Sequence, residues 1–296
     1  MNRTAKLFVL SFVLLLLGGF TAAPGLGQEP AETLPPETYL ARRDADMKRW
    51  LLAYDATLTD AQADEIVRTR AIDPEKPMVA LTFDDGPVAG VTDKLLDILE
   101  ENNARATFFV LGAKLKKEPN AAILPRMLSL GCEIGNHTFN HVRLKNVSKK
   151  AGLKEVTRVN ERVAELTGGY AVTSLRPPGG MTNNHVINMA ADAGMSLILW
   201  SQSCDVNELS PERIAANVLV QPKNKRELQS GDIVLLHDTK DRMVDAMSIL
   251  IPQLVADGWQ LVTVQELLSL SEAGYIPGIQ YTSATDYHGL LKTVKK

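Results

Sequence analysis

Two adjacent carboxylates, Asp84 and Asp85, directly follow the apolar run Met78–Phe83 in the segment TFDDGP. Neighbouring carboxylates repel each other unless a cation or a shared proton gives them different roles. One of the two then suits a metal ligand and the other a general base. Taken alone, the segment also suits a plain turn, because Asp-Gly-Pro favours loops.

A pair of histidines, His137 and His141, follows a second apolar run, Cys132–Gly135. Two imidazoles and one carboxylate form a three-ligand site that leaves coordination positions open, as catalytic metals require. Both rings can face one point if His141 opens a helical turn. Thr, Phe and Asn lie between them, so the Glu of a zincin protease is missing and that class is excluded.

Three further polar groups end or follow apolar runs. Arg176, in the segment RPPGG, is suited to holding a carboxylate in place, and the glycines that follow let backbone N–H groups approach a ligand. The polar residues from Ser201 to Asp205 indicate little alone. His237 ends the very apolar run that contains Leu235, and alone it reads more simply as a buried, hydrogen-bonded histidine.

The elements that must position these groups alternate along the chain. Short apolar or β-branched runs are separated by helical patterns, which predicts βα units and a parallel sheet. The predicted strands are Met78–Phe83, Ala106–Val110, Cys132–Gly135, Val172–Leu175, Ser196–Trp200, Ile233–Leu236 and Trp259–Val264, and the clearest predicted helices are Thr92–Asn102, Ser148–Leu166, Asn183–Ala193 and Arg242–Asp257.

The chemical groups lie at the carboxyl ends of separate predicted strands, where parallel sheets bind ligands. Strands in an open sheet are about 4.8 Å apart, so the ends of so many strands cannot meet at one point unless the sheet curls. We therefore predict an α/β fold, a distorted (β/α) barrel of about seven parallel strands.

The composition agrees with a globular domain. Of 296 residues, 45% are hydrophobic, and 32 basic against 35 acidic side chains leave a formal charge of −3. Disorder is excluded, and the absence of a basic block predicts that nucleic acid is not a partner. Cys132 and Cys204 are expected at opposite ends of the barrel, too far apart to bond. His185 and His288 are expected at the surface.

Residues 1–27 read as a targeting segment. Arg3 and Lys6 precede an uncharged stretch whose most apolar part has the length of a secretory h-region. We expect a signal peptide, with an uncleaved membrane anchor as the alternative. The protein is thus expected to be exported, as a periplasmic, extracellular or outward-facing anchored protein that meets a membrane only through this segment.

The rest of the chain divides by composition. Proline and acidic residues make 28–37 a linker, and near-helical spacing from Tyr39 to Tyr54 predicts a helix. Thr59 or Asp60 can cap a second helix that runs to Thr69. We expect a linker and helical arm at 28–76, the main domain at 77–270 and a C-terminal tail at 271–296.

The segments TFDDGP, HTFNH, RPPGG and LLHD, in this order, resemble the polysaccharide deacetylases of the nodulation-deacetylase-like type, carbohydrate esterase family four. The segments ATFFVLG and GCEIGNHT support the likeness, which covers about Met78 to Leu270. The resemblance implies a distorted (β/α) barrel with fewer than eight regular units. It also implies that the main domain is a metal-dependent deacetylase of acetylated sugars.

By position, the resemblance implies Asp85, His137 and His141 as metal ligands, Asp84 as the base and His237 as the general acid. Arg176 would then orient Asp84. The Gly179 N–H would help to stabilise the oxyanion, and Leu235 would line the pocket for the acetyl methyl group.

Two positions depart from the family pattern. Gly179 stands where members usually have an aromatic residue, and Gln202-Ser203-Cys204-Asp205-Val206 replaces an Asp-x-x-Asp-Trp segment. We assign Asp205 as the acid that partners His237, although a shift of one residue would put Val206 there. The departures remove two aromatic walls from the groove and leave the choice of substrate open.

The leading hypothesis is an exported, divalent-metal deacetylase that acts on N-acetylglucosamine units of peptidoglycan or chitin-like oligomers. Zinc is the first choice on ligand type, and cobalt, nickel or manganese also fit. The alternatives are an O-acetyl esterase on xylan or another acetylated glycan, and a catalytically weak glycan-binding relative. Retention of both Asp84 and His237 argues against the last, since a binding protein needs neither base nor acid.

Overall fold

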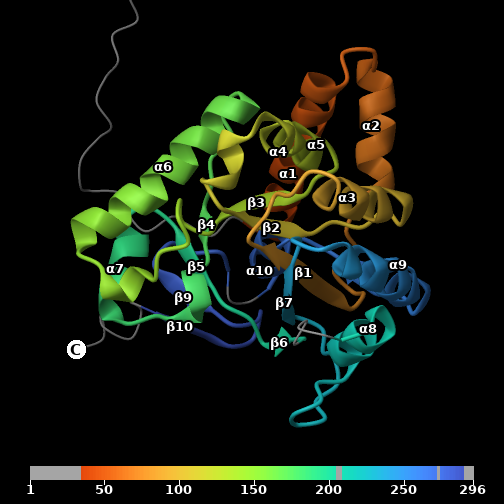
Figure 1. Cartoon of the computed structure of the whole chain (residues 1–296). Coiled ribbons are helices and arrows are strands. Elements are labelled where there is room, and N and C mark those ends of the chain that lie inside the picture. The colour runs from red at the N-terminus through yellow and green to blue at the C-terminus, as the bar shows by residue number, and fades with distance from the viewer. Residues whose placement is uncertain (1–34, 205–208, 272–273, 290–296) are drawn as a thin grey trace, which may run out of the picture.

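The computed structural model describes residues 35–204, 209–271 and 274–289 (Figure 1). The expected targeting segment, residues 1–27, lies outside the described residues, as do Asp205 and Val206. Among the helices described, none is long and apolar enough to cross a membrane.

The alternation of strands and helices is confirmed. All seven apolar runs form strands: β1 Met78–Asp84, β2 Thr107–Val110, β3 Glu133–Asn136, β4 Ser174–Leu175, β5 Ser196–Ile198, β7 Ile233–His237 and β8 Gln260–Leu261. The four helical patterns form α3 Thr92–Glu101, α6 Lys149–Thr167, α7 Asn184–Asp192 and α9 Asp241–Ala256.

Several shorter elements carry too little pattern to be predicted. They are the helices α4 Glu118–Ala121, α5 Ile123–Ser129, α8 Pro211–Leu219 and α10 Val264–Ser269, and the strands β6 Gln202–Ser203, β9 Ile279–Tyr281 and β10 Tyr287–Gly289. Strand β9 pairs in parallel with β5, and β10 pairs antiparallel with β9. The sheet therefore continues into the residues expected to form only a tail.

The strands follow one another in the order β10-β9-β5-β4-β3-β2-β1-β7-β6, and β8 pairs with the first residues of β1. In a flat sheet, β4 and β1 would be about 14 Å apart, since two strands lie between them. Arg176, at the end of β4, nevertheless donates a hydrogen bond to Asp84 on β1 at 2.8 Å. The sheet is therefore curled into a half-barrel, as the convergence of the strand ends predicts (Figure 1).

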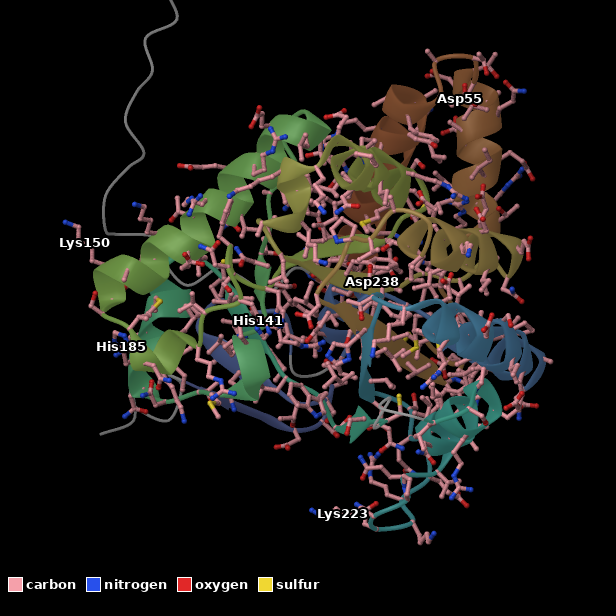
Figure 2. All side chains as sticks on the ribbon, in the orientation of Figure 1. Asp55, His141, Lys150, His185, Lys223 and Asp238 are labelled. Carbon is pink, nitrogen blue, oxygen red and sulfur yellow. The ribbon has the colours of Figure 1, made fainter. Side chains whose placement is uncertain are left out.

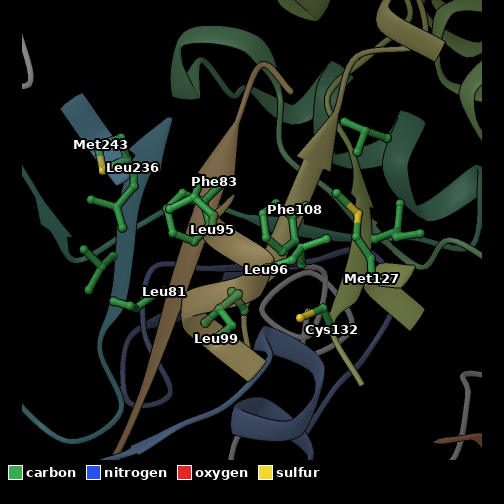
Figure 3. Packing of buried hydrophobic residues seen from close by; sticks show 14 of the residues in the cluster. Leu81, Phe83, Leu95, Leu96, Leu99, Phe108, Met127, Cys132, Leu236 and Met243 are labelled. Atoms are coloured by element: carbon green, nitrogen blue, oxygen red, sulfur yellow. The ribbon is translucent and has the colours of Figure 1, made fainter. Parts of the chain in front are cut away.

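Alternate residues of the strands face two cores. Phe83 and Phe108 stack on the outer face, with ring centroids 5.2 Å apart, and pack against α3 through Leu95 and Leu99 (Figure 3). Phe109 belongs to the smaller inner core, which fills the half-barrel. This alternation fixes the register of the strand ends, because a slip by one residue would exchange the two faces.

The two helices expected before the main domain are α1 Pro36–Tyr54 and α2 Asp60–Thr69, and Thr59 forms a capping box with Gln62. Arg43 of α1 is buried and donates to Glu266 of α10 at 2.8 Å. This ion pair fastens the arm to the main domain at the amino ends of the strands, far from the predicted site.

Candidate active site

Asp84 is the last residue of β1, and its backbone lies opposite His237 of β7 in the sheet register. Its side chain is buried, and its Oδ1 accepts the hydrogen bond from Arg176. Its Oδ2 lies 3.6 Å from Nε2 of His137. One carboxylate oxygen is therefore held by the arginine, and the other faces the histidines.

Arg176 has no exposed surface, and four groups accept its hydrogen bonds. Nε donates to the Ile198 carbonyl and Nη2 to the Leu199 carbonyl, while Nη1 donates to Asp84 Oδ1 and to Thr82 Oγ1. Burial lowers the pKa of Arg176, and Asp84 opposes that shift, so the guanidinium remains charged. The prediction that Arg176 holds a carboxylate in place agrees with this geometry.

Asp85 adopts a positive φ of 71°, which is uncommon for a residue other than glycine and often marks a functional turn. The turn directs its carboxylate toward the two histidines. Its Oδ1 lies 3.6 Å from Nε2 of His137 and 3.4 Å from Nε2 of His141. Among the described residues this buried oxygen has no hydrogen-bond partner.

His137 is buried directly after β3, and its Nδ1 lies 2.8 Å from the main-chain oxygen of Arg176. A carbonyl oxygen can only accept, so Nδ1 carries the proton and Nε2 presents its lone pair to the site. Burial lowers the pKa of His137, although the Asp84 and Asp85 carboxylates oppose the shift. The ring is therefore held neutral, the form that coordinates a metal.

His141 reaches the same point by a route that the spacing did not predict. It lies outside any helix, in a loop where both Thr138 and His141 adopt positive φ, 68° and 57°. The loop is held by two hydrogen bonds, from Thr138 N to Asn136 Oδ1 at 2.7 Å and from Val142 N to Thr138 Oγ1 at 3.1 Å. A left-handed loop, not the expected helical turn, brings the two rings to a centroid separation of 5.1 Å.

Asp85, His137 and His141 thus offer one carboxylate oxygen and two imidazole nitrogens, all within 4.8 Å of one another. A buried carboxylate oxygen without a donor, beside a neutral imidazole whose other nitrogen is fixed by a carbonyl, is the environment that a divalent cation needs. The donor set fits zinc, cobalt, nickel or manganese.

His237 ends β7 on the other side of the site and is half-buried. Together with Asp85, Ile214 and Met243 it lines a cavity of about 260 Å³. Its Nδ1 has no hydrogen-bond partner within the part of the chain described. Leu235 lies two residues earlier, so it faces the same side of the sheet and is half-buried there.

Gly179 lies in a short 3₁₀ turn, Pro178–Gly180, with φ 72°. A Cβ at this position would come no closer than 3.9 Å to Met181 Cγ and 4.0 Å to Arg143 Nε. Gly180 is more confined, because a Cβ there would lie 2.6 Å from the Trp200 ring. Trp200 therefore packs directly behind the RPPGG loop, while the space beside Gly179 is open.

Asp238, directly after His237, is a buried carboxyl group to which the sequence pattern assigned no role (Figure 2). It is buried, accepts a hydrogen bond from Thr92 Oγ1 at 2.6 Å, and lies so close to Gly86 that a Cβ there would be 2.1 Å from its Oδ2. Burial raises its pKa to about 7. The sequence feature that could have identified Asp238 is its position directly after His237, at the end of an apolar strand.

Comparison with known proteins shows clear similarities. Residues 71–198 match the family model for polysaccharide deacetylase. The chain is 34% identical over 201 residues to the peptidoglycan-N-acetylmuramic acid deacetylase PdaC of Bacillus subtilis, an alignment that covers 68% of this chain but only 40% of that protein.

Two further similarities cover nearly the whole of the other protein. The chain is 34% identical to a peptidoglycan-N-acetylglucosamine deacetylase of Bacillus cereus, over 64% of this chain and 88% of that one. The structure of a family 4 acetyl xylan esterase from Clostridium thermocellum, in complex with a cobalt ion, aligns with a TM-score of 0.63 and 30% identity, over 71% of this chain and 100% of that one.

Proposed function

Because this chain belongs to the polysaccharide deacetylase family, we propose that it is an exported, metal-dependent enzyme that removes acetyl groups from N-acetylglucosamine-containing polysaccharide. Membership makes it a hydrolase that deacetylates polysaccharide. The proposal adds the amide-linked acetyl group of peptidoglycan or chitin-like oligomers as the bond that is cut. The observation that carries it is the convergence of Asp84, Asp85, His137, His141 and Arg176 on one point.

In this proposal Asp85, His137 and His141 hold the metal. The Nε2 atoms of the two histidines and Oδ1 of Asp85 are the donors, because each faces the others within coordination reach. Zinc is the metal we propose, and cobalt, nickel and manganese suit the same donors. A bound divalent cation supplies Lewis-acid polarisation of the acetyl carbonyl and makes water more acidic.

Asp84 is the proposed general base. Arg176 holds its Oδ1, so Oδ2 stays directed toward the site and can accept a proton from a water molecule there. His237, on the opposite side, is the proposed general acid for the departing amine. The Gly179 N–H is the proposed hydrogen-bond donor to the developing oxyanion, and Leu235 the apolar contact for the acetyl methyl group.

An O-acetyl esterase on xylan or another acetylated glycan is the second candidate. The structural similarity to an acetyl xylan esterase favours it. The same base and ligands suit an ester, but an alkoxide leaves more readily than an amine and depends less on a general acid. Loss of His237 should therefore cost an amide-cleaving enzyme more than an esterase.

Acetate release tests both candidates. The full-length protein, stripped of metal and then reloaded with zinc or cobalt, is incubated with N-acetylglucosamine oligomers, peptidoglycan and acetylated xylan. The proposal expects metal-dependent acetate release from the amide substrates. Release from xylan alone would replace it with the esterase, and release unaffected by metal removal would refute the ligand assignment.

Export is part of the same proposal, and the targeting pattern of residues 1–27 supports it. Expression of the full chain in a bacterium, followed by fractionation and N-terminal sequencing of the mature protein, tests it. A cytoplasmic product that still begins at Met1 would contradict export.

A further inference from the structure

Gly179 leaves an opening in the loop that follows Arg176, and the charged side chain of Arg143 borders that opening. The glycine has no side chain, and at φ 72° an L-residue would be strained. The Nε of Arg143 would lie 4.0 Å from a Cβ at position 179. Among the described residues, Arg143 Nε is thus the polar atom nearest to that Cβ position.

The backbone of Arg143 is held firmly in this place. It follows the ligand candidate His141 by two residues and caps the 3₁₀ turn Leu144–Asn146. Leu144 is completely buried, and the Asn146 N–H donates to the Arg143 carbonyl at 2.9 Å. The loop that positions the metal ligand therefore positions Arg143 as well.

The charge of Arg143 is not neutralised within the described part of the chain. Its side chain is exposed, and among the described residues neither an ion pair nor a hydrogen bond satisfies it. Two further exposed cations without a described partner, Lys240 and Arg242, line the cavity that contains Asp85 and His237. The acid between them, Asp241, is already paired with Lys94 at 2.7 Å.

We propose that Arg143 is a specificity-determining residue that binds a carboxylate on the glycan, beside the sugar that carries the scissile acetyl group. This inference rests on the proposed function. An unpaired guanidinium in an open groove pairs with a carboxylate in preference to a neutral hydroxyl, because two parallel N–H donors match its two oxygens. Lys240 and Arg242 add positive potential on the other side of the site, which attracts an anionic glycan.

Two sources can supply that carboxylate: the lactyl ether of a muramic acid residue and the peptide attached to it. The test uses glycan tetramers of equal length. One is a peptide-free peptidoglycan strand, the second is the same strand with its lactyl groups methyl-esterified, the third carries stem peptides, and the fourth is chitotetraose. The esterified strand keeps the bulk of the lactyl group but loses its charge.

The expected wild-type result is a higher kcat/KM for the free-acid or peptide-bearing strand than for the esterified strand. In R143Q the ratio of acid to ester should fall about tenfold, mainly through KM, because glutamine lacks the positive charge and the paired N–H donors of the guanidinium. R143K should recover part of the ratio, since it restores the charge without the planar fork. K223Q is the matched control, because Lys223 is exposed on a loop far from His141 (Figure 2).

The outcomes separate the two proposals. A ratio that R143Q leaves unchanged, or that K223Q lowers equally, overturns the role of Arg143 even when acetate is released normally. Absence of acetate release from every glycan refutes the proposed function instead. Calorimetric binding of the acid and ester strands then still tests the carboxylate preference, and equal affinities would refute it.

Discussion

Arg176 and Asp84 are joined by a hydrogen bond of 2.8 Å, although β4 and β1 are separated by two strands. The same arginine offers its main-chain oxygen to Nδ1 of His137. Its side chain thus orients the proposed base, and its backbone fixes the tautomer of a proposed ligand. These two functions reside in different parts of one residue, so substitution can separate them.

R176K should lower kcat about 100-fold while metal binding persists. Lysine keeps the charge but cannot satisfy the carbonyls of Ile198 and Leu199 together with Asp84, so the carboxylate loses its fixed orientation. The unfolding free energy should also fall by roughly 3 kcal/mol, because a buried ionic network is disrupted. Measurements of kcat, metal content and denaturant unfolding check this, and loss of the metal would show that the side chain also supports the ligands.

Variants of the proposed base Asp84 and the proposed ligand His137 should differ in metal content. D84N should retain metal while turnover falls by orders of magnitude, because an amide cannot accept the proton. H137A should lose metal and activity together. Metal analysis of the purified variants, alongside acetate release, makes the comparison, and normal turnover by D84N would show that Asp84 is not the base.

The sequence predicted the strands well, because seven apolar runs bounded by turns leave few alternatives to a parallel sheet. Among the residues named from the sequence, Asp84, Asp85, His137, His141 and Arg176 do lie close together at the strand ends. It did not predict the loop at His141, since the positive φ angles at Thr138 and His141 accompany two short-range side-chain hydrogen bonds, to Asn136 Oδ1 and Thr138 Oγ1, and these leave no apolar periodicity in the sequence. Strand β9 was missed for a similar reason, because three residues carry too little periodicity.

The raised pKa of Asp238 should make the stability of the protein depend on pH. Burial raises the pKa of Asp238 in the folded protein to about 7, from an ordinary value of 3.8. The folded state therefore retains a proton that the unfolded state releases, and the unfolding free energy falls as pH rises through this interval, then stays constant. The loss is at most about 4 kcal/mol in metal-free protein.

D238N should remove this dependence, because an amide does not titrate. Chelator-treated wild type and variant should have similar stability near pH 4, and the variant should be the more stable of the two at pH 8. Urea unfolding at both values measures the difference. Parallel curves for the two proteins would show that Asp238 titrates at an ordinary pKa when folded.

The cysteines should remain reduced. Cys132 lies just before β3 and Cys204 just after β6, at opposite ends of strands that are four positions apart in the sheet. Burial raises the pKa of Cys132 to about 11, so its reactive thiolate form is scarce. Thiol titration of unfolded, unreduced protein should count two thiols, and a count of zero would contradict this arrangement.

The sequence assigned no role to Arg143 or Asp238, and for the same reason. Each is recognised only through a glycine far along the chain, Gly179 for Arg143 and Gly86 for Asp238. The space beside a glycine depends on which residues the fold brings next to it, and the sequence alone does not show them. The groove, unlike the metal ligands, is therefore defined mainly by tertiary structure.

The variant G179Y tests whether the space beside Gly179 weakens sugar binding or accommodates a substituent of the glycan. The space can accept a side chain, since nothing lies within 3.9 Å of the Cβ position, but φ 72° should cost about 1 kcal/mol of stability. An aromatic face near the metal would add binding area for a sugar ring. If the native enzyme binds the central sugar weakly and depends on contacts with distant sugars, G179Y should raise kcat/KM more for short N-acetylglucosamine oligomers than for long ones. If G179Y changes kcat/KM equally at every oligomer length, or lowers it, the opening beside Arg143 instead accommodates a bulkier substituent. In that case G179Y should lower activity most on peptide-bearing glycan.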